Sequence, residues 1–220
     1  MVTYGLIAAC GIMFGYELSL GPRLDDFIEA QAFIPEQFTR ALQGKGSLLE
    51  SARRAVVSMF LHGGWLHVIG NLLYLRVFGD NIEDRLGSVA FGAFYVVAGL
   101  AGTLAHYSLV PGSDLPMVGA SGAIAGVLGA YLVAFPSARI VTLFPVFIFL
   151  TFIEVPAFVF LGLWALQQSL YGMLTLEKGL AGVGGVAWFA HLGGFAVGLG
   201  AGVWIRIEKR RRRRRSRTRA

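Results

Sequence analysis

The stretch Gly119-Ala120-Ser121-Gly122-Ala123-Ile124-Ala125-Gly126 places one hydroxyl group among small residues at the start of a short apolar run. Small residues of this kind let membrane helices pack with their backbones close together. We read the stretch as the outer end of a membrane-embedded helix over about 121–135. Such a helix rises only about 22 Å, against a hydrocarbon core of about 30 Å, so Ser121 is expected to lie below the outer membrane surface.

Composition separates this chain from ordinary soluble domains. Hydrophobic residues make up 55% of its 220 residues, charged residues only 15%, and there are 30 glycines. The net charge of +6 comes from a run of basic residues over 209–219. After a long apolar segment, such a run marks the cytoplasmic flank and contacts anionic lipid, so we expect no nucleic-acid partner. One cysteine allows no internal disulfide, and we expect no metal site and no cofactor.

Hydropathy predicts an all-α, polytopic membrane protein with a bundle of six transmembrane helices. The domain is expected to cover 1–206, with a basic cytoplasmic tail over 207–220. Residues 21–58 mix charged and apolar side chains and read as an amphipathic outer connection of short interfacial helices. Residues 136–155 hold an apolar run too short to span, which we interpret as re-entrant or interfacial. The predicted spans are 2–20, 59–79, 87–109, 121–135, 156–172 and 184–206.

Charge also predicts the orientation in the cell membrane. The basic tail is expected in the cytoplasm, and an even number of spans places the N-terminus there as well. The connections 21–58, 110–119 and 173–183 would then face outside, and a site near Ser121 would open to the outer side. Five basic residues within 21–58 weigh against this orientation, although acidic residues in the same connection balance them.

Several polar side chains fall at one depth on the outer side of separate predicted helices. His62 and His67 stand at the outer end of 59–79, and Asn71 lies one turn below His67. His191 is expected about 10 Å into 184–206. Alone, each has a structural explanation, because such residues often join neighbouring helices. Since intramembrane ionisable groups are costly, their convergence near Ser121 favours chemistry.

A serine hydroxyl needs a base, and His191 is the candidate. None of the thirteen acidic residues is expected at the same depth, so we predict a dyad whose imidazole is oriented by packing. The backbone N–H of Ser121 at a helix N-terminus, with side-chain donors from Asn71 and His67, would form an oxyanion hole.

These residues resemble the rhomboid family of intramembrane serine proteases. The second-helix motif HxxxxHxxxN is met at 62–71, the GxSG motif at 119–122, and the sixth-helix motif AHxxGxxxG at 190–198. The segment 78–87 is similar to the family's second-loop signature, a charged turn. The resemblance implies structural support from His62, Gly122, Glu83, Arg85, Gly194 and Gly198.

The resemblance further implies a prokaryotic six-span protease with catalytic Ser121 and His191. Oxyanion or substrate-binding roles would fall to His67, Asn71 and Gly119. Implied substrates are single-span membrane proteins cleaved near the outer face, with 156–183 as the substrate gate. The chain departs from the family in two places. Arg53-Arg54 stands where a Trp-Arg pair is frequent, and Ala125 stands where some members carry a tyrosine stacked on the histidine.

Other function classes remain open at this point. A catalytically silent rhomboid-like protein would bind membrane clients without cutting them, although both Ser121 and His191 are present. Paired membrane histidines could also hold haem in a redox protein. A small-solute transporter is disfavoured because the chain shows no internal repeat.

Overall fold

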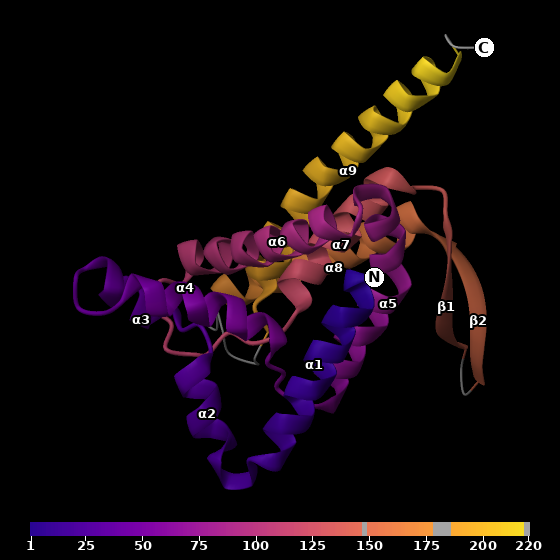
Figure 1. Cartoon of the computed structure of the whole chain (residues 1–220). Coiled ribbons are helices and arrows are strands. Elements are labelled where there is room, and N and C mark those ends of the chain that lie inside the picture. Colours follow the sequence, from indigo (N-terminus) through magenta and orange to yellow (C-terminus); the bar gives the residue numbers. More distant parts are fainter. Residues whose placement is uncertain (147–148, 178–185, 218–220) are drawn as a thin grey trace.

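The computed structural model describes residues 1–146, 149–177 and 186–217, and most of them are helical (Figure 1). Helices form a bundle from which a β-hairpin and the end of the last helix project. The elements are α1 (Val2–Ser19), η1 (Gly21–Arg23), α2 (Leu24–Gln31), α3 (Pro35–Leu42), α4 (Leu48–Val57), η2 (Ser58–Phe60), α5 (Trp65–Leu86), α6 (Ser88–Leu109), α7 (Ser121–Ala134), β1 (Arg139–Val146), β2 (Phe149–Pro156), α8 (Ala157–Glu177) and α9 (Trp188–Arg217).

Among the described residues, four helices are long and apolar enough to cross a membrane: α1, α6, α8 and α9. Leu48–Phe60 and Trp65–Leu86 meet the same test as a pair, bent by 85° between them, and α7 is apolar but shorter. This is an all-α polytopic membrane architecture, as the sequence predicted. The number of six spans stays a prediction, because length and composition give four, or five with the bent pair.

Helix α7 occupies the centre of the bundle, and all its residues from Gly122 to Tyr131 are buried. It packs most extensively against α9. A Cβ atom added at Gly194 would overlap the carbonyl oxygen of Gly122, and one added at Gly198 would overlap that of Gly126. The glycines therefore let the backbones of α7 and α9 touch, which is how small residues pack membrane helices.

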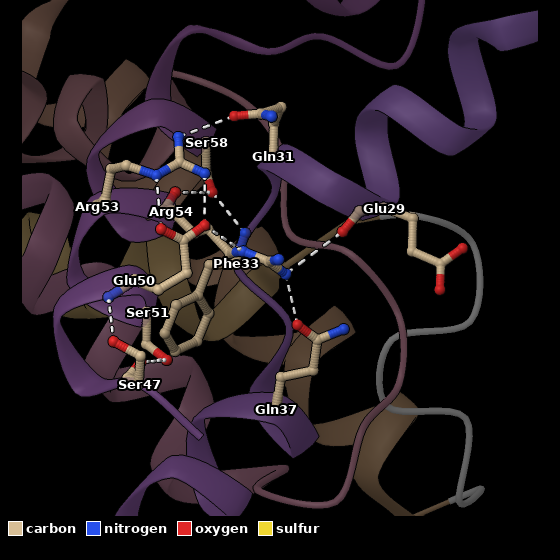
Figure 2. Close-up of polar contacts among 10 residues, drawn as sticks. All are labelled: Glu29, Gln31, Phe33, Gln37, Ser47, Glu50, Ser51, Arg53, Arg54 and Ser58. Atoms are coloured by element: carbon tan, nitrogen blue, oxygen red, sulfur yellow. Dashed lines mark hydrogen bonds and ion pairs between the residues drawn. The ribbon is translucent and has the colours of Figure 1, made fainter.

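The 21–58 connection folds into three short α-helices, α2 to α4, held by a polar network (Figure 2). Ser47 caps α4 by accepting the backbone N–H of Glu50 at 3.2 Å, the first half of a capping box. The Glu50 carboxylate then binds the guanidinium groups of Arg53 and Arg54. Arg53 also donates to Gln31 at 2.8 Å, and Arg54 to Gln37. Both arginines thus tie α4 to the segments before it.

Residues 136–155, interpreted from the sequence as a re-entrant or interfacial segment, lie largely in an antiparallel hairpin. Their placement at the membrane stays a prediction. Strand β1 pairs with β2 from Arg139 opposite Pro156 to Val146 opposite Phe149. The hairpin exposes apolar side chains and carries an ion pair of 3.7 Å between Arg139 and Glu154 near its base. Its β-branched and aromatic residues favour extended backbone. The exposed apolar side chains include Val141, Leu143, Leu150 and Phe152.

Several predicted boundaries shift for identifiable reasons. The second span was expected from 59, but Gly64 with φ of 148° breaks the chain before α5 begins at Trp65. The expected charged turn at 78–87 is instead helical up to Leu86, and Gly87 with φ of 83° ends it. The basic tail continues α9 as far as Arg217. Residues 178–185, part of the expected gate and of the expected last span, lie outside the described residues.

Candidate active site

Ser121 and His191 meet at the contact between α7 and α9. Ser121 is the first residue of α7, and His191 lies in the first turn of α9. The hydroxyl Oγ of Ser121 is 2.8 Å from Nε2 of His191. His191 was expected about 10 Å into its span, but α9 begins only at Trp188, three residues before it. Its depth in the membrane stays a prediction. The pairing itself needs only that the two helix starts lie side by side.

The second ring nitrogen of His191 has a partner that the sequence analysis missed. Nδ1 lies 2.7 Å from Oε1 of Gln168, a buried side chain of α8. The search for an orienting group considered only carboxylates and therefore passed over an amide. A signal was present, because Gln167 and Gln168 are the only amide side chains within the apolar sequence of α8.

Two tryptophans enclose the imidazole ring. The ring of Trp164 on α8 lies 6.0 Å from that of His191, tilted by 35°, and Trp188 meets it edge to face at 6.3 Å. Ala125, where some rhomboid sequences carry a stacked tyrosine, is fully buried on α7. In this chain the aromatic contacts of His191 come from α8 and from the start of α9.

His67 and Asn71 of α5 bring hydrogen-bond donors to the same cavity as Ser121. Nδ1 of His67 accepts the backbone N–H of Gly63 at 3.4 Å, which leaves the ring proton on Nε2. Nδ2 of Asn71 is buried and has no hydrogen-bond partner in the described part of the chain. An unpaired buried donor is costly, so a ligand oxygen would stabilise it.

Gly119 was predicted to bind the oxyanion or the substrate, but its backbone N–H is already engaged. Its N–H donates to the carbonyl of Ser58 at 2.9 Å, so this amide is not free to bind an oxyanion. Its φ is 120°, and an added Cβ would lie 2.6 Å from Nε2 of His67. Gly119 therefore contributes a backbone conformation and the space in which the His67 ring lies.

His62 is buried next to His67. Its backbone N–H donates to the carboxylate of Glu17 on α1 at 3.1 Å, and its Nδ1 donates to the carbonyl of Phe60 at 3.0 Å. Its ring meets that of His67 edge to face, with centroids 5.3 Å apart. These contacts make His62 a buried support for the entry to α5. In the described residues, no group of three or more His, Cys, Asp or Glu side chains could hold a metal ion.

Two of the remaining predicted support residues, Glu83 and Arg85, lie far from the hydroxyl of Ser121. Glu83 is about 24 Å along α5 from His67, and its carboxylate accepts hydrogen bonds from the N–H of Val2, the N–H and hydroxyl of Thr3, and the hydroxyl of Ser88. It therefore joins the start of α1 to α5 and α6. The guanidinium of Arg85 lies over the ring of Phe135, 5.3 Å from its centroid. Gly122, Gly194 and Gly198 lie in the contact between α7 and α9 described above.

The candidate site opens into a cavity of about 660 Å³. Its lining comes from α5, α7 and α8, from the 110–120 loop, and from the start of α9 with the two residues before it. Its walls are mainly apolar, with a few polar groups near Ser121, as in most binding pockets. Apolar lining residues include Leu66, Tyr74, Pro116, Val118 and Trp164.

The fold and the site together define a polytopic membrane protein with a serine–histidine pair between its helices. A family model described as Rhomboid domain matches residues 50–208. The chain therefore belongs to the rhomboid family and is a multi-pass membrane protein, which confirms the resemblance seen in its motifs.

Similar proteins come from a plant, a bacterium and a mammal. RHOMBOID-like protein 5 of Arabidopsis thaliana is 39% identical over 79 residues, 36% of this chain and 26% of that protein. Putative rhomboid protease YdcA of Bacillus subtilis (strain 168) is 35% identical over 79 residues, 36% of this chain and 39% of that protein. Presenilin-associated rhomboid-like protein, mitochondrial, of Bos taurus is 35% identical over 97 residues, 43% of this chain and 26% of that protein. Each match thus spans less than half of the relative.

Proposed function

We propose that this chain is an intramembrane serine endopeptidase that hydrolyses peptide bonds in or near transmembrane segments of single-span membrane proteins. The observation that carries the proposal is the distance of 2.8 Å between Oγ of Ser121 and Nε2 of His191. A nucleophile and its base need this separation, and both stand in a cavity large enough for an extended peptide segment. Membership of the rhomboid family supports the same reaction class.

In the proposed first step, the Ser121 oxygen attacks the carbonyl carbon of the scissile bond while Nε2 of His191 takes the hydroxyl proton. A tetrahedral intermediate forms, and its oxygen carries a negative charge. The donors available to that oxygen are the N–H of Ser121, at the N-terminus of α7, and the side chains of Asn71 and His67. Donors fixed before the reaction stabilise such an oxyanion without reorganisation.

The intermediate then collapses and the C–N bond breaks. The imidazolium of His191 gives its proton to the leaving amine, and an ester between Ser121 and the substrate's new C-terminal acyl group remains. Water entering the cavity attacks this ester, with His191 again accepting a proton. The second collapse returns that proton to Ser121 and releases a carboxylic acid.

The proposal is tested with purified full-length protein in detergent and in vesicles, against a panel of labelled single-span substrates. Wild type is expected to cleave at a defined bond and to react with a fluorophosphonate probe. Ser121→Ala and His191→Ala are expected to lose cleavage by at least about 10³-fold. Ser108→Ala is the matched control, because the hydroxyl of this exposed residue donates to the carbonyl of Ala105 in its own helix.

Cleavage that survives in Ser121→Ala would contradict the assignment of the nucleophile. A wild-type protein that binds the substrates but neither cleaves them nor reacts with the probe would instead indicate the catalytically silent client binder.

We also propose that the protein lies in the cell membrane with both termini in the cytoplasm and the cavity opening to the outer side. The support is the strongly basic end of α9, because arginine-rich segments that follow a span remain in the cytoplasm. There they would contact anionic lipid, and nucleic acid is not an expected partner.

A further inference from the structure

We propose that Gln168 is a positioning residue of the active site. It would hold His191 in the one tautomer that can accept the proton of Ser121, in place of the carboxylate of the usual triad. This inference rests on the proposed function, since it assigns a role within the same reaction. It also makes a statement about the imidazole that can be measured without any activity.

The two hydrogen bonds of the imidazole define the tautomer. A neutral imidazole has one N–H donor and one bare nitrogen acceptor. To act as a base, Nε2 of His191 must be bare toward Oγ of Ser121, which lies at 2.8 Å. The proton must then be on Nδ1, which needs an acceptor, and Oε1 of Gln168 lies at 2.7 Å from it. With Oε1 of Gln168 facing the ring, the hydrogen bonds run one way: Oγ of Ser121 donates to Nε2 of His191, and Nδ1 of His191 donates to Gln168.

Burial makes this acceptor important. Only 6% of Gln168 is exposed. Without it, the Nδ1–H group would be left unpaired unless the ring changed tautomer or rotated. In the other tautomer Nε2 carries the proton and donates it to the Ser121 oxygen, so that the ring cannot serve as a base. Loss of the acceptor would therefore lower the fraction of molecules ready to react.

The position of Gln168 on α8 gives it a second contact with the same ring. Trp164 precedes it by one helical turn, so both side chains lie on one face of α8. The ring of Trp164 lies 6.0 Å from the imidazole, tilted by 35°, while Gln168 hydrogen-bonds its Nδ1 atom. Together they fix the plane and the rotation of the ring from a single helix. An uncharged amide does this at less cost than a carboxylate, because a buried charge inside a membrane is expensive.

Three variants separate this role from a merely structural one. Gln168→Leu keeps the approximate volume but removes the acceptor, and Gln168→Glu keeps an acceptor. Gln167→Leu makes the same change at the neighbouring exposed position, outside the contact with His191. The measurements are kcat and KM on a cleaved single-span substrate, the rate of fluorophosphonate labelling, thermal unfolding, and the ¹⁵N shifts of the His191 ring.

For Gln168→Leu we expect kcat and the labelling rate to fall by about 10- to 100-fold, the effect of leaving one buried donor unpaired. KM and the unfolding temperature are expected to stay close to those of Gln167→Leu. Gln168→Glu should recover most of the lost kcat. In the ¹⁵N spectrum, wild type and Gln168→Glu should show Nδ1 protonated and Nε2 bare, and Gln168→Leu should show a mixture or the opposite tautomer.

The proposal is overturned if Gln168→Leu matches Gln167→Leu in kcat, or if its ring tautomer is the same as that of wild type. Should wild type show no cleavage that depends on Ser121, the protease function fails, and the ¹⁵N comparison still decides the role of Gln168. The two failures are therefore distinguishable.

Discussion

Nε2 of His191 lies 2.8 Å from Oγ of Ser121, although 70 positions separate the two residues in the chain. They meet because both residues stand in the first turn of their helices, and those helices cross with touching backbones. The geometry of the pair therefore depends on glycines that carry no chemistry themselves.

Gly198→Ala tests this dependence, with Gly200→Ala as the matched control. A Cβ at Gly198 would overlap the carbonyl of Gly126, whereas one at Gly200 meets no described atom within 4 Å. We expect Gly198→Ala to destabilise the fold by about 1–3 kcal/mol, the usual cost of overpacking. Thermal unfolding and fluorophosphonate labelling of Ser121 measure it. Equal unfolding temperatures for the two variants would disprove the close contact between α7 and α9.

Gly119→Ala is expected to reduce kcat while leaving the fold intact. The new Cβ would lie 2.6 Å from Nε2 of His67, and the alanine would have to adopt a backbone conformation that favours glycine. Displacing that ring would remove one of the proposed oxyanion donors, and loss of such a donor in serine proteases costs about 10²–10³ in kcat. Gly112→Ala, in the same loop with no described atom within 4 Å of its Cβ, is the control. Steady-state cleavage by both variants provides the comparison, and equal rates would refute the donor role of His67.

Glu83→Gln should loosen the start of α1 without touching the site. The two carboxylate oxygens accept hydrogen bonds from the backbone N–H groups of Val2 and Thr3. In the glutamine variant one of these oxygens becomes an NH2 group, which would face a backbone N–H that it cannot accept. We expect a loss of about 1–3 kcal/mol in unfolding free energy, together with faster hydrogen exchange in α1. The exposed Asp84→Asn is the control. Unchanged exchange in α1 would show that Glu83 does not anchor this helix.

Trp164 and Ala125 are expected to be coupled. Trp164→Ala removes the ring that packs on His191 and should lower kcat about 2- to 12-fold, the range of one aromatic contact. Ala125→Tyr alone should also be harmful, because Ala125 is fully buried. The double variant removes the indole from α8 and adds a phenol ring on α7, so it should be more active than either single variant. A double-mutant cycle on kcat measures this coupling, and purely additive effects would argue against it.

Orientation can be measured with single cysteines. Cys10 is fully buried, so a membrane-impermeant thiol reagent should ignore it. Leu115→Cys, in the loop before α7, is expected to react from outside intact cells. Val89→Cys, at the other end of the bundle and 90% exposed, should react only after the membrane is opened. The reverse pattern would invert the proposed topology.

The sequence was most informative where chemistry and spacing coincide. Ser121, His191, His67 and Asn71 could be proposed together because polar groups are rare in apolar helices and each therefore stands out. The all-α membrane architecture followed from hydropathy, which reflects a strong physical constraint. Gly122, Gly194 and Gly198, which the family resemblance marked as structural support, do lie where two helices touch, since close approach demands small residues.

Other features depend on tertiary contacts that a single sequence does not display. Gln168 reaches His191 only because α8 lies beside α9, and its register relative to α9 cannot be read from either helix alone. The occupied N–H of Gly119 depends on a carbonyl at Ser58, far away in the sequence. Apolar runs such as 139–156 suit strands and buried helices equally well, so periodicity did not reveal the hairpin.

The junction between the hairpin and α8 has a mechanical consequence. Two backbone hydrogen bonds, from Ala157 to Ala138 and from Phe158 to Pro136, pin the first turn of α8 to the chain that leaves α7. Any sideways swing of α8 must therefore pivot about that turn. Gln168 lies about 16 Å along α8 from that turn, so a tilt of the helix by roughly 10° would move Gln168 by about 3 Å. Such a movement would separate the amide of Gln168 from the imidazole of His191, and the base would then lack its orienting hydrogen bond.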